Sequence, residues 1–320
     1  MCELLGISAN HPLKKISLFK EFKKRGIINP DGWGIGFYKK RSFSLFKEEK
    51  NILESNAFEK FIIKMPPARL IIAHVRKSSV GDNTIENTHP FKKILNGKTF
   101  VFAHNGTLKS LEHFFPLKRF FPTGKTDSEY AFCYLLERLH EISLSNWKEE
   151  HFNFLAKIIS QINKKGSFNM LLSEGRYLFS YFDKTGFNGL CYNLKTEEKT
   201  KKISIIASKR LTSEKWRSFK FGELIVFQKG EPIFSNKRSI KDIIKSSEFI
   251  YEKQILEFLN SFKKREIKIK DILEHLKLPK KITLESLHSL LCKGEIEQID
   301  WTKRKWNNIN SHYKIVKNDG

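Results

Sequence analysis

The chain begins Met1-Cys2-Glu3-Leu4-Leu5-Gly6-Ile7-Ser8, with a cysteine directly after the initiator methionine. Removal of Met1 would leave a residue that carries both a thiol and a free α-amine. That amine has a reference pKa of about 7.7–8.0, so a useful fraction is neutral near pH 7 and can accept the thiol proton. The apolar residues that follow would anchor this end in a buried strand. Cysteine also occurs at position two by chance, so the stretch predicts a nucleophile only together with residues downstream.

The composition indicates a globular chain with a sizeable core. Its 320 residues, 40% of them hydrophobic, suggest either two domains or one large domain with an extension. No apolar run is long enough to span a membrane, and no cationic segment precedes an apolar segment and cleavage site as in a signal peptide. The lipobox that a lipoprotein cysteine needs is also missing. We therefore expect a cytoplasmic protein without a membrane partner.

The four cysteines, Cys2, Cys133, Cys191 and Cys292, are widely separated and form no Cys-x-x-Cys pair. This spacing argues against a zinc site or a disulfide framework. We expect the last three to be small buried apolar residues, and we expect no metal and no other cofactor.

The net charge of +24 is high enough to suggest a nucleic-acid-binding protein. However, the chain has 47 lysines and only 12 arginines, and the lysines are spread throughout, together with many Phe and Ile residues. This distribution is typical of a compositional bias rather than of a binding patch. Each arginine is therefore more informative than each lysine.

A continuous apolar run over residues 69–75 predicts a fully buried strand that ends at Arg76. The guanidinium fork of an arginine suits bidentate capture of a carboxylate, and the hydroxyl of Ser79 could add a donor. The alternative is a surface arginine on a loop.

A second strand, residues 98–104, leads into Asn105-Gly106. Asn-Gly after an apolar run typically forms a tight hairpin turn, which is the structural alternative here. In the functional interpretation, the Asn105 amide and the Gly106 N–H converge on one point as two donors to a developing oxyanion. Residues 107–121 lack the alternation of a partner strand, which argues against the hairpin.

Thr126 and Glu129 have the spacing of a capping box, which places Asp127 at the first position of a helix. The Asp127 carboxylate could complement the helix dipole, or it could bind an ammonium group of a ligand. The sequence leaves both interpretations open.

Strand and helix patterns alternate over the first 230 residues. Residues 31–38 contain three glycines and predict a turn into a strand that another backbone or a ligand can approach closely. Strands interrupted by helices indicate an α+β sandwich rather than a doubly wound parallel sheet. We predict helices over residues 129–140 and 148–162 and further strands over residues 168–172, 176–182, 203–207 and 223–228.

Taken together, these segments resemble the class II glutamine amidotransferases, a branch of the N-terminal nucleophile hydrolases. The resemblance is closest to free-standing members without a synthase domain, and it implies a four-layer αββα sandwich with the amino terminus at the open end of two stacked sheets. The matching segments, in family order, are Met1-Cys2-Glu3-Leu4-Leu5-Gly6, Pro30-Asp31-Gly32-Trp33-Gly34, His74-Val75-Arg76-Lys77, Thr88-His89-Pro90-Phe91, Ala103-His104-Asn105-Gly106-Thr107, Thr126-Asp127-Ser128-Glu129, and Ala207-Ser208 with Leu211-Thr212 and Trp216.

The resemblance implies one role for each candidate residue. These roles agree with the chemistry of the residues, because a zwitterionic amino acid needs one fixed cation and one fixed anion, and acyl transfer needs a nucleophile, a base and two donors. Cys2 would be the nucleophile with its α-amine as base, Asn105 and the Gly106 N–H would bind the oxyanion, Arg76 and Ser79 the α-carboxylate of glutamine, Asp127 its α-ammonium, and His89 would be structural.

Two departures from the family pattern concern residues outside these roles. Asn29 stands where the family often has a histidine before the Pro-Asp-Gly-Trp-Gly motif, and Lys209-Arg210 replaces a common Glu-Pro pair. Both could alter the rim of the pocket.

The family pattern stops near Ser246, so we expect a catalytic domain over residues 1–246 and an extension over residues 247–320. The extension holds 15 basic and 11 acidic residues, a net charge of only +4, so +20 of the total +24 lies before residue 247. Packing against the catalytic domain, or docking of a partner, is therefore favoured over DNA reading. Its patterns predict helices over residues 251–262, 269–276 and 284–291 and short strands over residues 295–299 and 312–316, with Trp301 to Trp306 between the strands, which makes a winged-helix-like arrangement one alternative.

We expect a glutamine-type amidohydrolase in which Cys2 attacks the side-chain amide of glutamine or of another γ-glutamyl small molecule. A separate synthase subunit could accept the ammonia. The alternative from another class is a catalytically inactive sandwich that acts as a nucleic-acid-binding or adaptor protein. The complete set of candidate residues argues against this alternative, because an inactive copy would be expected to have lost some of them.

Overall fold

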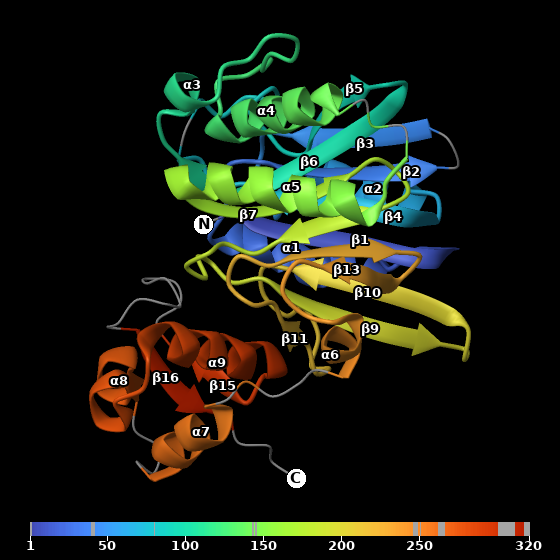
Figure 1. The fold of residues 1–320 in the computed structure, drawn as a ribbon. Coiled ribbons are helices and arrows are strands. Elements are labelled where there is room, and N and C mark those ends of the chain that lie inside the picture. Colours follow the sequence, from blue (N-terminus) through green and yellow to red (C-terminus); the bar gives the residue numbers. More distant parts are fainter. Residues whose placement is uncertain are drawn as a thin grey trace.

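The computed structural model describes residues 2–39, 42–79, 81–142, 144, 146–245, 249, 251–261, 266–299 and 311–316. Two antiparallel sheets stack face to face, and helices cover both outer faces (Figure 1). This is the αββα sandwich of the N-terminal nucleophile hydrolases that the sequence predicts.

The first sheet has seven strands in the order β11-β9-β10-β1-β4-β2-β3. Strand β1 lies in the middle and pairs with β10 on one side and with β4 on the other. Cys2, which directly precedes β1, therefore lies at the amino-terminal end of the central strand. The strands of this sheet are β1 (Glu3–Leu13), β2 (Trp33–Lys39), β3 (Ser42–Glu48), β4 (Ala68–Val75), β9 (Cys191–Glu197), β10 (Lys201–Ala207) and β11 (Arg217–Ser218).

The second sheet has six strands in the order β13-β12-β8-β7-β6-β5. Its two longest strands, β6 and β7, pair along the whole of Val101 to Leu108. The strands of this sheet are β5 (Phe91–Leu95), β6 (Lys98–Leu108), β7 (Gly166–Ser173), β8 (Leu178–Tyr181), β12 (Leu224–Gln228) and β13 (Glu231–Ser235).

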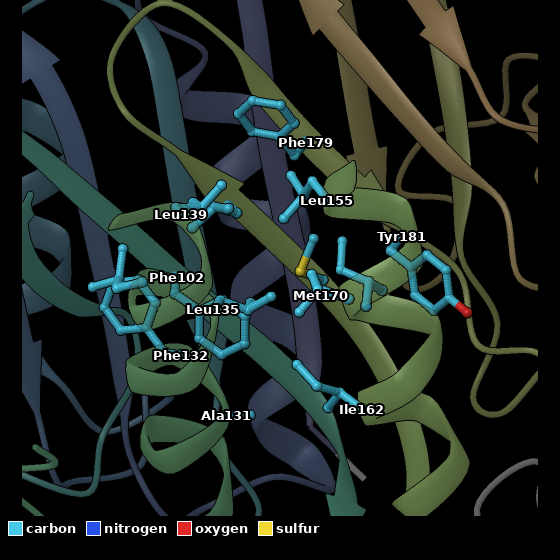
Figure 2. Close-up of a cluster of buried hydrophobic side chains, with 14 of the residues drawn as sticks. Phe102, Ala131, Phe132, Leu135, Leu139, Leu155, Ile162, Met170, Phe179 and Tyr181 are labelled. Atoms are coloured by element: carbon cyan, nitrogen blue, oxygen red, sulfur yellow. The ribbon is translucent and has the colours of Figure 1, made fainter. Parts of the chain in front are cut away.

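Helices α1 (Ile16–Lys23) and α2 (Asn56–Lys64) pack on the seven-stranded sheet. Helices α4 (Asp127–Glu141) and α5 (Glu149–Ile162) pack on the six-stranded sheet, where Figure 2 shows Phe132 and Leu155 against Met170. Shorter elements connect these layers: η1 (Lys24–Ile27), α3 (Leu111–Phe114), η2 (Asn163–Lys165) and α6 (Ile240–Lys245).

Both faces of β1 are buried, which explains its nearly continuous apolar sequence. Leu5 and Ile7 point toward the helices and share a core with Phe19 of α1. Leu4 points the other way and packs with Val101 between the two sheets.

The hairpin alternative for Asn105-Gly106 is wrong. Strand β6 continues through both residues to Leu108, and Asn105 lies opposite Asn169 of β7. Gly106 is needed for close packing, because a Cβ atom there would lie 2.0 Å from the carbonyl oxygen of Ser167. The predicted strand was therefore too short at its carboxyl end.

The region after α6 forms a compact unit of three helices and a three-stranded sheet in the order β14-β16-β15. This agrees with the winged-helix-like arrangement, although the sequence missed the short β14. Ser246, Trp301 and Trp306 lie outside the described residues. The elements are α7 (Glu252–Ser261), β14 (Ile267–Lys268), α8 (Ile269–Leu276), α9 (Lys280–Lys293), β15 (Ile296–Gln298) and β16 (His312–Ile315).

Helix α9 joins this unit to the sandwich, and it lies beneath β11 in Figure 1. His288 of α9 contacts the Ser218 hydroxyl at 2.6 Å and accepts a hydrogen bond from the Leu190 N–H at 3.2 Å. Glu285 of α9 accepts a further bond from the Phe221 N–H at 3.0 Å. Ser286, Leu287, Ser289 and Leu290 are also buried, so α9 offers little free surface to a DNA groove.

We predict that removing residues 247–320 causes aggregation or lowers the unfolding temperature, because the deletion exposes the apolar surface that α9 covers. Size-exclusion chromatography and thermal unfolding of a chain that ends at Ser246 measure this. A soluble, fully active truncated protein with an unchanged unfolding temperature would contradict the prediction.

We also predict that the full-length protein binds duplex DNA weakly and without sequence preference. Helix α9, which would have to enter the DNA groove, is largely buried, and the positive charges are dispersed along the chain. Binding should fall steeply in a salt series. Tight, sequence-dependent binding at physiological salt would show that the extension is a DNA reader.

None of the helices in the described part of the chain is long and apolar enough to cross a membrane.

Candidate active site

Cys2 lies just before β1 and is partly buried. Its Sγ atom lies 3.2 Å from both the backbone nitrogen and the carbonyl oxygen of Lys77, in the loop after β4. Burial raises the pKa of the Cys2 thiol, and the Lys77 backbone and Arg76 oppose this only in part. The thiol is therefore protonated near pH 7, so a nucleophilic role requires a base that removes its proton.

Two asparagine amides converge on the Cys2 carbonyl oxygen. Asn105 Nδ2 donates to this oxygen from β6, and Asn188 Nδ2 donates to it over 3.0 Å from the loop before β9. Asn105 is buried, and its amide nitrogen carries two hydrogens, so one remains for a second acceptor. The stacking of the two sheets thus brings Asn105 to the nucleophile across 103 residues of sequence.

Arg76 follows β4 directly, and its backbone N–H donates to the Gly32 carbonyl over 2.8 Å. Its guanidinium is buried and turns toward the next loop. Nη1 donates to the Asn83 side chain at 3.1 Å, and Nη2 is shared between the Ser78 hydroxyl and the carbonyls of Gly81 and Asp82 at 3.1–3.2 Å. The surface-arginine alternative is therefore wrong, and in this structure Arg76 organises the loop beside Cys2.

Ser79 and Asp127 both lie at the carboxyl end of β6. The Ser79 hydroxyl is exposed and lies 3.4 Å from the Thr107 hydroxyl. Asp127 Oδ2 accepts a hydrogen bond from the Leu108 N–H at 2.6 Å. The structure therefore gathers all six candidate residues around the amino-terminal end of β1 and the carboxyl end of β6.

The helix start at Asp127 is as predicted. Thr126 is the N-cap of α4, and its hydroxyl accepts a hydrogen bond from the Glu129 N–H at 3.1 Å. The Glu129 carboxylate does not complete the capping box, because it accepts from the Gly124 N–H at 2.8 Å. Asp127 thus both begins the helix and ties it to β6.

Sequence reasoning missed three polar residues of this region. Asn188 gave no sequence signal, since its contact with Cys2 spans 186 residues. Asp31 lies in the Pro-Asp-Gly-Trp-Gly motif and accepts from the Ser78 N–H at 2.7 Å. His104 is buried between the Ser128 hydroxyl at 2.8 Å and the Ser167 carbonyl at 3.1 Å, so it supports α4 against β7.

His89 is buried and packs against His74, with ring centroids 4.2 Å apart and the ring planes tilted by 35°. Burial and the neighbouring histidines hold the pKa of His89 well below its usual value, so the ring is neutral. It makes no contact with Cys2, in agreement with a structural role. The nearby glycine motif is also structural, because a Cβ atom at Gly34 would lie 2.3 Å from the His89 carbonyl oxygen.

Comparison with known proteins places the chain in a family. Residues 1–197 match the family model of class II glutamine amidotransferases. The chain is 31% identical to a Haemophilus influenzae protein named "Putative glutamine amidotransferase", over 73% of this chain and 86% of that one. It is 35% identical to an uncharacterized protein of Methanocaldococcus jannaschii over 98% of this chain and 92% of that one. The latter similarity includes the extension.

Solved structures agree with this placement. One solved structure is a predicted glutamine amidotransferase from Pseudomonas aeruginosa, which is 27% identical to this chain and has a TM-score of 0.54. The alignment covers 73% of this chain and all of the Pseudomonas chain. The glutamine phosphoribosylpyrophosphate amidotransferase of Bacillus subtilis, at 17% identity and a TM-score of 0.56, shares the fold over 73% of this chain and 49% of its own. The chain belongs to the class II glutamine amidotransferases.

Proposed function

We propose that the protein hydrolyses the side-chain amide of glutamine or of a γ-glutamyl small molecule, with Cys2 as the nucleophile. The observation that carries this proposal is that the Asn105 amide reaches the Cys2 carbonyl, with Arg76 next to the Cys2 contact at Lys77 and Asp127 bound to the end of β6. Nucleophile, oxyanion donor, cation and anion then surround one substrate.

The reaction needs two acyl-transfer steps. After removal of Met1, the free α-amine of Cys2 takes the thiol proton, and the sulfur attacks the amide carbon. The Asn105 amide and the Gly106 N–H stabilise the oxyanion, the C–N bond breaks, and the amine leaves with the proton. Water then attacks the γ-glutamyl thioester through a second oxyanion, which releases glutamate and restores the thiol.

Substrate binding would use residues near the carboxyl ends of β4 and β6. Arg76 with Ser79 would hold the α-carboxylate, and Asp127 would hold the α-ammonium. Two Nη2 hydrogens of Arg76 are shared among three neutral acceptors. A carboxylate is a stronger, charge-assisted acceptor, so it can replace these contacts.

The location and partners of the protein follow as further proposals. We propose a cytoplasmic enzyme that needs no cofactor. If glutamine is the substrate, we propose that a separate synthase subunit uses the ammonia. We further propose residues 1–246 as the catalytic domain and residues 247–320 as a structural or protein-docking extension.

The direct test is to incubate the full-length protein with glutamine and a panel of γ-glutamyl amides and to measure released glutamate. Turnover of at least one compound by the wild type, and none by Cys2→Ala, is expected. Cys133→Ala is the matched control, since it removes a buried thiol of α4 that has no role in the proposed reaction. Equal turnover by Cys2→Ala would contradict the proposal.

Arg76→Lys is expected to raise KM by about tenfold or more, because an ammonium cannot reproduce the two parallel hydrogen bonds of the guanidinium fork. Steady-state kinetics of glutamate release measure this. The variant also weakens the loop contacts of Arg76, so its unfolding temperature is measured in parallel. Wild-type KM and kcat would show that Arg76 is not the carboxylate clamp.

A further inference from the structure

A cavity of about 330 Å³ lies where α9 and β15 meet the seven-stranded sheet. The sandwich supplies three cationic residues to its wall, Arg25, Lys209 and Arg210. The extension supplies the apolar side chains of Leu291 and Ile296. This volume is in the range of small-molecule sites, which often occur between two structural units.

The cationic wall has few acidic partners among the described residues. Arg25 Nη2 donates to the Arg210 carbonyl at 2.9 Å. Arg25 Nε is buried and has no hydrogen-bond partner among the described residues. Lys209 Nζ lies 3.8 Å from the buried Glu3 carboxylate. No ion pair of Arg25 or Arg210 occurs in the described residues.

Two further observations bear on the charge of the cavity. Glu297 also lines it, but its carboxylate pairs with Lys314 at 2.7 Å. Burial lowers the pKa of Lys209, Arg25 lowers it further, and Glu3 opposes this. The three cations Arg25, Lys209 and Arg210 thus outnumber the two nearby carboxylates, Glu3 and Glu297, and Glu297 is itself paired with Lys314.

The cavity adjoins the nucleophile from the side opposite to Arg76. Asn188 lines it and donates to the Cys2 carbonyl at 3.0 Å. Ser208 also lines it, and its hydroxyl accepts from the Leu4 N–H at 2.9 Å. The start of β1 therefore separates this cavity, on the β10 side, from the Arg76 loop, on the β4 side.

We propose that this cavity binds a small molecule that combines a carboxylate or phosphate group with an apolar body, and that its binding alters glutamate release at Cys2 through Asn188, which lines the cavity and donates to the Cys2 carbonyl. The anionic group would pair with the guanidiniums of Arg25 and Arg210, and the apolar body would contact Leu291 and Ile296. The binding site is independent of the proposed function, whereas its effect on glutamate release rests on that function.

Calorimetric titration of the full-length protein tests the binding site. The probes are 3-phenylpropionate and phenyl phosphate, with the neutral 3-phenylpropanol as their uncharged counterpart. We expect at least one anionic probe to bind, and the alcohol to bind at least about tenfold more weakly, because it lacks the charge-assisted hydrogen bonds. Arg25→Gln and Arg210→Gln should each weaken binding of the anionic probe by about tenfold as well. Arg25→Lys should retain part of the affinity.

Arg69→Gln is the matched control, since it removes the same charge from an exposed residue of β4 that does not line the cavity. Arg25→Gln also loses the contact with the Arg210 carbonyl, so Arg210→Gln, which leaves that contact in place, provides the second variant. Equal affinities in Arg69→Gln and Arg210→Gln, or no binding of either anion at about 10 mM, would overturn the site.

Glutamate release in the presence of saturating anionic probe tests the effect on catalysis. We expect kcat or KM to change in the wild type, and the change to be reduced in Arg210→Gln. A probe that binds without changing either parameter would overturn the proposed coupling between the cavity and Cys2. If the wild type releases no glutamate from any compound, the proposed function fails, and the calorimetry still decides the cavity.

Discussion

Cys2→Ala is expected to lower the rate of glutamate release on the order of 10⁶-fold, as the loss of the nucleophile does in other acyl-transfer enzymes. The thiol is positioned between the Lys77 backbone groups and has no neighbouring cysteine that could replace it among the described residues. Steady-state assays with high enzyme concentration measure the residual rate.

The fold should survive this substitution. Alanine removes only the Sγ contacts with Lys77, while the Asn105 and Asn188 hydrogen bonds reach the Cys2 carbonyl and remain. Circular dichroism and thermal unfolding should therefore match the wild type closely. A variant that is unfolded would not test the mechanism, so Cys2→Ser, which keeps the size of the side chain, accompanies it and should also be inactive.

Asn105→Ala is expected to lower kcat by about 10²–10³-fold, or roughly 2.7–4 kcal/mol, with a smaller change in KM. The reason is that the amide would donate to the oxyanion, which exists only in the transition state and intermediate. Steady-state kinetics and thermal unfolding of the same preparation separate a catalytic loss from a loss of stability.

Asn188 provides the matched control for this prediction, because its amide also donates to the Cys2 carbonyl. Its φ is 56°, so glycine is the replacement that the backbone tolerates. If Asn105 acted only by holding the Cys2 backbone, Asn188→Gly would lower kcat as much. A clearly smaller loss in Asn188→Gly is expected, and equal losses would contradict the oxyanion role.

The sequence predicted strands β1, β4 and β6 in the interior of the sheets but missed the interior strand β9. Residues 70–73 of β4 and 100–103 of β6 are continuous apolar runs because both faces of these strands are buried, so their patterns are strong. Strand β3 was missed, since it lies at the sheet edge with mostly half-buried residues and no clear alternation. A hydrophobic pattern arises where side chains are buried, and the side chains of an edge strand are less buried.

The candidate site was predictable only in part. Cys2 is signalled by its position directly after the initiator methionine. The Thr126 cap is signalled by the spacing of three residues to Glu129. The contacts of Asn188 with Cys2 and of Arg76 with the Gly81 and Asp82 carbonyls depend on how the sheets and loops close. No local pattern encodes such distances, so the convergence of these residues had to come from the three-dimensional structure.

The most direct test of the account is mass spectrometry of the active protein after treatment with a glutamine analogue that carries a diazoketone in place of the side-chain amide. The account predicts a mature chain that begins at Cys2 and a single covalent label on the Cys2 sulfur, with loss of activity in proportion to labelling. A fully active protein that uniformly retains Met1, or inactivation through a label on another residue, would contradict it.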